Sequence, residues 1–302
     1  MGIPTTTLTA AARARHDTLV GVRDHLTLMK PKVTGLLTAF GVVAAIVADA
    51  DVAPWRVALF ALLGFMAAGG AAALNHLFDR DIDARMARTR SRPLPSGRMT
   101  PRAAARFAAL LLGLSLPLAF VLLGPVVAWL FAAGAAVYGG LYTLVLKRRT
   151  PQNIVIGGLA GSLGVLAGWA VADPGLALGA WGLALLVFLW TPPHFWGLAI
   201  ARDADYRAAG VPMLPQARGI AHTAGAMSGY ALLMLVVSLA LVSVTALGTT
   251  FLVSALVLGA AFTALCVAFW RQPERRLAML VFKLSGAYLG LLLVAMWVDL
   301  LV

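Results

Sequence analysis

Nine long apolar runs constrain this chain more than any other feature of its sequence. Each approaches the roughly 20 apolar residues that an α-helix needs to cross about 30 Å of hydrocarbon. Charged residues make up only 12% of the chain, about half of the roughly 25% that is usual in soluble domains. The sequence therefore predicts an all-α integral membrane protein with about nine transmembrane helices. The runs lie near residues 33–49, 56–77, 103–123, 125–146, 154–171, 176–200, 222–246, 249–270 and 280–301.

The positive charges fall on one side of this predicted topology. Of the 24 lysines and arginines, all except Arg56 lie in the N-terminal segment or in the loops after the second, fourth, sixth and eighth runs. The opposite side carries Asp49, Asp51, Asp173 and Asp299. Because basic loops stay in the cytoplasm, we expect a cytoplasmic N-terminus. Topology and lipid bilayer contact account for the net charge of +12, so we expect no nucleic-acid partner.

The segment before the first run lacks the apolar stretch and cleavage site of a signal peptide. We expect a multi-pass protein of the bacterial plasma membrane, with the mitochondrial inner membrane as the alternative. The single cysteine, Cys266, excludes a disulfide within the chain. We interpret 1–302 as one membrane domain, with a polar segment at 1–29 and two cytoplasmic active-site loops at 78–102 and 201–221.

The first loop opens with a set of oxygen-bearing side chains. Asn75, Asp79 and Asp83 are spaced i, i+4, i+8, so on a helix they share one face. Carboxylate and amide oxygens suit a hard divalent cation, and we predict that these three residues bind Mg²⁺. Asp81 points away from that face, which favours a solvated acid or an arginine partner.

Cations surround these acids. Arg88 and Arg92 are four residues apart, and Lys147 and Arg148 close the fourth run on the same side. Since such groups hold phosphate oxygens, we predict that these four residues bind a diphosphate. The alternative is an ordinary positive-inside loop, in which the cations serve topology only. The first loop contains seven arginines: Arg80, Arg85, Arg88, Arg90, Arg92, Arg98 and Arg102.

The second loop resembles the first one weakly, since it also begins with acids and ends in a proline-bounded turn. Asp203 and Asp205 are candidates for a second metal site. Residues two apart do not share a helix face, so we favour Asp205 as the catalytic ligand and retain Asp203 as a candidate. The alternative to a duplication is that any two cytoplasmic loops look alike.

A histidine lies among aromatic residues and a proline pair near the end of the sixth run. Residues 190–196 read Trp-Thr-Pro-Pro-His-Phe-Trp, and the prolines are expected to kink the helix. His194 beside that kink would suit a flat aromatic macrocycle, and helical spacing would let it face one cavity with Asp205. The alternative is a histidine that bonds a carbonyl freed by the prolines.

Together these stretches resemble the UbiA superfamily of intramembrane prenyltransferases, and within it the branch that acts on heme. The resemblance runs from about Lys30 through the last run. One departure is Ala201, where other branches carry an additional aspartate four residues before Asp205. The blocks are Asn75, Asp79 and Asp83; 86–89 with Arg92-Pro93; 142–143 with 146–148; 153–158; 190–196; and 205–206 with 209–215.

The resemblance implies a UbiA-type helical bundle enclosing an intramembrane cavity. It also implies a reaction in which the farnesyl group of farnesyl diphosphate passes to the vinyl group of heme b, giving heme O and diphosphate. Mg²⁺ is the expected cofactor and heme b is a substrate. Catalytic roles are expected for Asn75, Asp79, Asp83 and Asp205. Heme contacts are expected for His194, Trp190, Trp196 and Tyr142.

Two other functions remain as alternatives at this point. A UbiA-type enzyme that prenylates a quinone precursor or another aromatic acceptor would share the first loop. A transporter is disfavoured because the span interiors carry almost no ionisable groups. A physical partner such as heme A synthase stays an open possibility.

Overall fold

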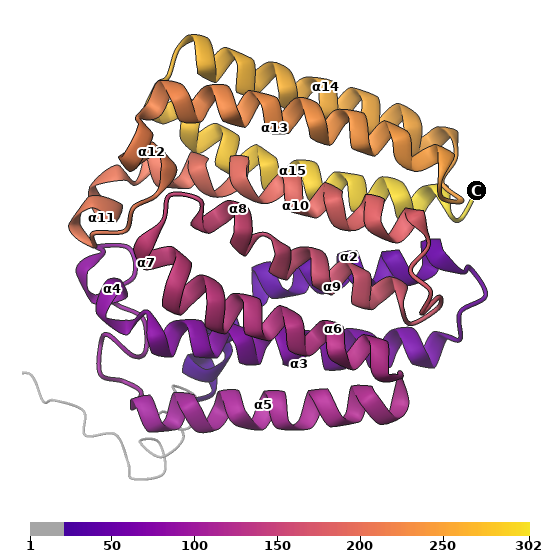
Figure 1. The fold of residues 1–302 in the computed structure, drawn as a ribbon, viewed down its shortest axis with the longest axis horizontal. Coiled ribbons are helices and arrows are strands. Elements are labelled where there is room, and N and C mark those ends of the chain that lie inside the picture. The colour runs from indigo at the N-terminus through magenta and orange to yellow at the C-terminus, as the bar shows by residue number, and fades with distance from the viewer. Residues whose placement is uncertain (1–20) are drawn as a thin grey trace, which may run out of the picture.

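The computed structural model describes residues 21–302, and its regular elements in that range are helical (Figure 1). Eight segments are long and apolar enough to cross a membrane, so the prediction of an all-α membrane protein is confirmed. They are α2 (Pro31–Ala48), α3 (Pro54–Phe78), α5 (Pro101–Leu122), the continuous α6 (Pro125–Ala135), η1 (Ala136–Leu146) and α7 (Lys147–Arg149), α10 (Leu178–Ala201), α13 (Ile220–Ala240) with η2 (Leu241–Ser243), α14 (Thr249–Arg271) and α15 (Arg275–Asp299).

The fifth apolar run is shorter than expected. It forms two consecutive helices, α8 (Asn153–Gly157) and α9 (Leu159–Trp169), that together fall below the length of the other spans. Proline-containing turns bound the run, with Pro151 on one side and Pro174 on the other. The estimate of nine spans therefore becomes eight full-length helices and one short pair in the described part of the chain.

Proline places the start of several spans. Because proline lacks a backbone N–H and has a helical φ, it suits the first position of a helix. Four long helical segments begin in this way, and Thr100 also caps α5 by accepting a hydrogen bond from the Ala103 N–H at 3.2 Å. The prolines are Pro31, Pro54, Pro101 and Pro125.

Short helices of the two polar loops, together with α7 at the end of the fourth span, gather at one end of the bundle, which we call the basic end. They are α4 (Arg80–Arg85), α7, α11 (Asp203–Ala208) and α12 (Leu214–Arg218), and they lie on the left in Figure 1, away from the C-terminus. Arg56, the exceptional cation, lies at the start of α3 near the opposite, acidic end. It donates to the carbonyls of Leu123 and Val171 at 3.2 and 3.1 Å, so its charge serves to join the ends of helices.

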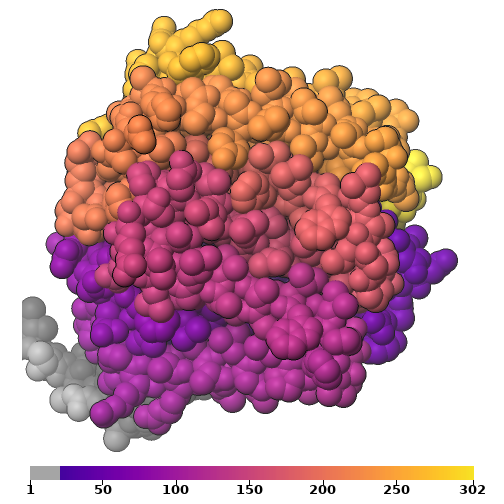
Figure 2. All heavy atoms as spheres, viewed as in Figure 1, coloured from indigo at the N-terminus to yellow at the C-terminus, as the bar shows by residue number. Residues whose placement is uncertain are grey.

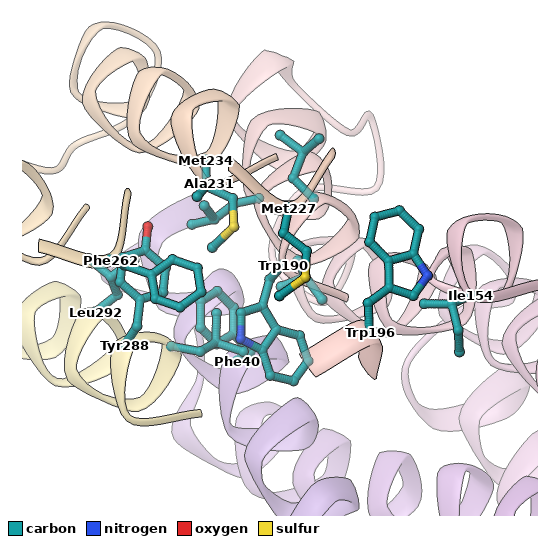
Figure 3. Close-up of a cluster of buried hydrophobic side chains, with 14 of the residues drawn as sticks. Phe40, Ile154, Trp190, Trp196, Met227, Ala231, Met234, Phe262, Tyr288 and Leu292 are labelled. Atoms are coloured by element: carbon teal, nitrogen blue, oxygen red, sulfur yellow. The ribbon is translucent and has the colours of Figure 1, made fainter. Parts of the chain in front are cut away.

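In the view of Figure 2, α5, α6 and the segment from α7 to α9 lie in front of much of α2 and α3. The larger hydrophobic cluster lies around α10, where Trp190 groups with Phe40 and Tyr288 in Figure 3. Burial of this apolar surface between helices holds α10 at the centre of the molecule and fixes the aromatic residues of its second half.

Candidate active site

The junction of α3 and α4 holds the three predicted metal ligands. Asn75, Asp79 and Asp83 are only 3%, 1% and 2% exposed. The helical register continues across the junction, because the Asp79 N–H donates to the Asn75 carbonyl at 2.9 Å and the Asp83 N–H donates to the Asp79 carbonyl at 2.7 Å. Asn75 Nδ2 also donates to Asp79 Oδ2 at 2.7 Å. The structure thus brings these side chains together, as their spacing predicts.

Each buried acid faces a cation, which for Asp79 comes from a distant segment and for Asp83 from the same loop. Lys147 Nζ donates to Asp79 Oδ2 at 2.5 Å, and Arg92 donates to both oxygens of Asp83 at 2.9 and 2.8 Å. The second oxygen of Asp79 is buried and has no partner among the described residues. Two of the four predicted diphosphate-binding cations therefore lie directly beside the acids.

Asn75 is held by a further group that sequence spacing did not reveal. Lys30 Nζ donates to Asn75 Oδ1 at 2.6 Å and to the Tyr138 hydroxyl at 2.8 Å, and Asn75 Nδ2 donates to Thr143 Oγ1 at 3.0 Å. Lys30 has a φ of 51°, a left-handed conformation that is uncommon outside glycine and recurs at functional sites. Burial, and then the charge of Arg92, lower the pKa of Lys30 to about 8.

A π-helix presents the residues that face Asn75. In η1 the backbone winds more widely than in an α-helix, and such segments are frequent at functional sites. The wider turn brings Thr143 over Tyr138, whose carbonyl accepts from Thr143 Oγ1 at 2.6 Å. The same segment stacks Tyr142 on Tyr138, with ring centroids 5.9 Å apart. The sequence carries no periodic signal for this winding, so the grouping of these residues was not predicted.

Asp81 and Arg148 pair at the rim of the site. Arg148 donates to both oxygens of Asp81 at 2.8 Å and to the Phe78 carbonyl at 2.8 Å. These hydrogen bonds hold the pKa of the Asp81 carboxyl well below its usual range. Asp81 is therefore an arginine partner, one of the two roles its spacing favours, and Arg148 is engaged with it.

A hydrogen bond from the first loop's backbone joins it to the second loop. Asp205 Oδ1 accepts from the Ala87 N–H at 2.9 Å, and Asp205 lines a surface pocket together with Arg88. Asp203 accepts instead from Arg207 at 2.8 Å and from Gln216 at 2.9 Å. Burial raises the pKa of Asp203, but these hydrogen bonds bring it below the ordinary value.

An apolar cavity of about 170 Å³ begins beside the buried acids. Lys30 and Tyr138 line its polar end, and both also contact Asn75. The rest of the wall is almost entirely apolar and comes from α2, α3, α6, α9 and α10. A charged head group at the acids would therefore lie next to an apolar chamber enclosed by spans.

The predicted aromatic contacts divide between this cavity and its surroundings. Trp190 lines the cavity and stacks on His194, with ring centroids 4.4 Å apart. His194 Nδ1 lies 2.7 Å from Ser285 Oγ on α15, and His194 is not part of the cavity wall. Trp196 is fully buried beside Ile154, apart from the Trp190 group in Figure 3.

One expectation about this region needs correction. His194 and Asp205 do not face one cavity, because α10 ends at Ala201 and the chain turns before α11 begins. The helical spacing from 194 to 205 is therefore interrupted. Tyr142, in contrast, lies near the polar end, where a Cβ on Gly157 would approach its Cδ2 to 2.6 Å.

The donor set at the α3–α4 junction fits a hard cation. Its oxygens come from Asn75, Asp79 and Asp83, and no residue from 21 to 302 donates to the buried Asp79 Oδ1. In residues 21–302, no group of three His, Cys, Asp or Glu side chains is arranged to hold a metal. An ion at this junction would therefore draw on Asn75 and on ligands from its substrate, as is usual for Mg²⁺. His76 is also buried here; neither ring nitrogen has a hydrogen-bond partner within residues 21–302, and Nδ1 lies 3.9 Å from Asp83 Oδ2.

These features define a class of helical membrane protein that brings an anionic head group and an apolar tail together inside a bundle. The chain belongs to the UbiA prenyltransferase family, whose family model matches residues 35–294. Its fold is similar to that of digeranylgeranylglyceryl phosphate synthase, with a TM-score of 0.76 and 20% identity over 92% of this chain and 98% of that one.

Other relatives extend this similarity. A UbiA homolog from Archaeoglobus fulgidus, solved bound to DMAPP and Mg²⁺, gives a TM-score of 0.69 with 14% identity over 92% of this chain and 99% of that one. Protoheme IX farnesyltransferase from Marinobacter nauticus is 43% identical over 94% of both chains. The enzyme of that name from Azotobacter vinelandii is 45% identical over 92% of this chain and 93% of its own.

Proposed function

We propose that the protein transfers the farnesyl group of farnesyl diphosphate to a vinyl carbon of heme b, giving heme O and diphosphate. The observation that carries this proposal is the direct junction between a buried, cation-rich polar site and an apolar cavity. The identity of 43–45% to proteins named protoheme IX farnesyltransferase supports the choice of substrates.

Binding of the diphosphate uses the cations that now bridge to the acids. Lys147, Arg92 and Lys30 all lie within hydrogen-bond reach of Asn75, Asp79 or Asp83. A diphosphate at this position shares these donors, and Arg88 and Arg148 approach from the rim. Since such donors stabilise charge that develops on a leaving group in a water-poor site, they favour departure of diphosphate from the farnesyl C1 carbon.

Mg²⁺, when bound, neutralises charge on the diphosphate oxygens. Asn75, Asp79 and Asp83 are its proposed ligands. Asp205 is a further proposed ligand, because its hydrogen bond to the Ala87 N–H holds it against the first loop. Asp203 is the remaining candidate. Asn75 is oriented for this task, because Lys30 and Thr143 hold both ends of its amide group.

Cleavage of the C1–O bond leaves an allylic cation in the cavity. The aromatic faces of Tyr138 and Trp190, which line the cavity, stabilise such a cation. The vinyl group of heme b supplies the electron pair of the new carbon–carbon bond. Water then adds to the resulting carbocation and releases a proton, so one water is consumed for each diphosphate formed. No covalent enzyme intermediate is required.

We place the heme acceptor against α10. His194 is oriented by Ser285, by stacking on Trp190 at 4.4 Å and by the tilted ring of Phe282 at 4.5 Å. Trp190 belongs both to this stack and to the cavity wall, so it joins the two sites. Tyr142 contributes near the polar end, while Trp196 supports α10 from the core.

The proposed setting is the plasma membrane of a bacterium, with the N-terminus and the basic end in the cytoplasm. The bacterial relatives and the distribution of basic residues support this orientation. An association with heme A synthase would pass heme O onward without release.

The test is to incubate membranes that contain the protein with farnesyl diphosphate, heme b and Mg²⁺. A heavier heme, separated by chromatography and identified by mass, is the expected product. Prenylated phenols formed from a quinone precursor, without a heavier heme, would instead identify an aromatic acceptor of another kind.

A further inference from the structure

Two phenylalanine rings close the apolar cavity at the end away from the acids. Phe60 on α3 and Phe131 on α6 both line it, and their ring centroids are 5.6 Å apart at an angle of 34°. Phe60 is 1% exposed and Phe131 is 7% exposed. Two large, almost fully buried rings therefore meet where the chamber ends.

Glycines allow these rings to span the chamber. A Cβ on Gly41 of α2 would lie 2.6 Å from Phe60 Cζ, and a Cβ on Gly64 would lie 3.3 Å from Phe131 Cζ. The Phe60 ring thus reaches across from α3 to the backbone of α2. At the same level α2 and α9 touch, because a Cβ on Gly168 would collide with the Gly41 backbone.

The space beyond the two rings is filled. Phe60 and Phe131 belong to a separate hydrophobic cluster whose members are mostly small and fully buried. Interiors of this kind are close-packed, so no room remains for an additional ligand segment. Removal of the Phe60 ring would open space toward Ala45, Ala167 and Val171 of the same cluster.

The position of the acids fixes the direction of a bound isoprenoid. The diphosphate lies near Asn75, so the tail must run along α3 toward Phe60. On α3 the lining residues extend from Ala72 to Phe60, a span of about 18 Å at roughly 1.5 Å per residue. A longer tail would meet the two rings.

We propose that Phe60, supported by Phe131, sets the maximum length of the isoprenoid diphosphate, so that farnesyl fits and geranylgeranyl does not. This inference depends on the proposed prenyl transfer but not on the identity of the acceptor. A single extra methylene in a closed apolar pocket is selected against by about tenfold or more. One additional isoprene unit therefore gives a discrimination of at least that size.

The experiment measures binding of non-hydrolysable farnesyl and geranylgeranyl thiolodiphosphates to the full-length protein in detergent with Mg²⁺. We expect Phe60→Ala to reduce the preference for farnesyl by about tenfold. Phe60→Leu keeps most of the bulk and should give a smaller shift in the same direction. Ala68→Leu, which fills the cavity on the acid side of the rings, should shift preference toward the geranyl analogue.

A matched control is Phe251→Ala. Phe251 is also fully buried in a long helix but does not line the cavity, so the ratio of affinities should stay at the wild-type value. If folded Phe60→Ala and Phe60→Leu proteins keep the wild-type ratio of farnesyl to geranylgeranyl affinity, the two rings do not limit the length of the isoprenoid. Tight farnesyl binding without a heavier heme would refute the proposed acceptor and leave the length limit standing.

Discussion

The two acidic loops at the basic end look alike in sequence but differ in burial and in their partners. In the first loop, Asp79 and Asp83 are almost completely buried, and each faces a cation. In the second loop, Asp203 pairs with Arg207, whose side chain is 62% exposed, and Asp205 bonds the Ala87 N–H. The charged groups of the first loop are therefore buried, whereas those of the second loop lie at the surface.

This difference indicates which acids take part in substrate binding. Burying a carboxylate is costly unless it is paired. In the first loop this cost is offset by Lys147 from a distant segment and by Arg92 from the loop itself. Such an arrangement binds an anionic substrate by exchanging one set of partners for another. The second loop has no comparable set of buried groups, so we expect its acids to contribute less to catalysis.

The largest effect is expected at the buried acids. Asp79→Ala and Asp83→Ala should each lower kcat/KM at least about a hundredfold, because transition-state charge loses its stabilisation. Chelation with EDTA should abolish turnover, and added Mg²⁺ should restore it. Heme O formation in membranes, normalised to the amount of inserted protein, measures both effects. Full turnover by both variants would remove the proposed metal site.

The pair of Lys147 and Asp79 provides the next test. Lys147→Met leaves a buried carboxylate unpaired and should destabilise the protein by about 3–5 kcal/mol. The double variant with Asp79→Asn should recover most of this stability and remain inactive. Thermal unfolding in detergent gives the comparison.

The control for that pair is the removal of the matching cation, Arg207, in the second loop. Arg207→Met should change stability by less than about 1 kcal/mol, since exposed ion pairs contribute little. An equal loss of stability in both loops would mean that burial does not distinguish them.

Asp205 is expected to have an intermediate effect. Asp205→Asn keeps an oxygen for the Ala87 N–H but removes the charge, and Asp205→Ala removes both. If the charge assists Mg²⁺ binding, both variants should weaken the apparent Mg²⁺ affinity by about tenfold, as measured by titration of activity. Wild-type behaviour of the Asn variant alone would show that Asp205 acts only by joining the loops.

The smallest effect is expected at Asp203. Its hydrogen bonds come from Arg207 and Gln216, so Asp203→Asn should leave kcat/KM within about threefold, in line with the small energies of exposed pairs. The assay is the same as for Asp79. A loss as large as that of Asp79→Ala would place a metal ligand in the second loop after all.

Local patterns in the sequence predicted the helices and the first acidic face. Apolar run length identified the spans, and the four-residue spacing of Asn75, Asp79 and Asp83 identified a shared face. Both features depend on residues that are near in the chain. The shortened fifth span was missed because run length alone ignored the prolines at its two ends.

Contacts between distant segments could not be predicted in this way. Lys30 reaches Asn75 from the residue before α2, and no spacing in the sequence connects these two residues. The π-helix that brings Tyr138 and Thr143 to Asn75 has no sequence periodicity of its own. The prediction that His194 and Asp205 face one cavity was wrong, because it required α10 to continue beyond Ala201.

The contacts of Arg56 bear on the order in which the molecule is assembled. A chain is made from its N-terminus, so Arg56 crosses to the acidic end before Leu123 and Val171, whose carbonyls it will bind, have been synthesised. The guanidinium can form both hydrogen bonds only after those two segments have been made. The contacts that join the start of α3 to the residues following α5 and α9, one helical turn from Phe60, therefore depend on parts of the chain that are added well after Arg56.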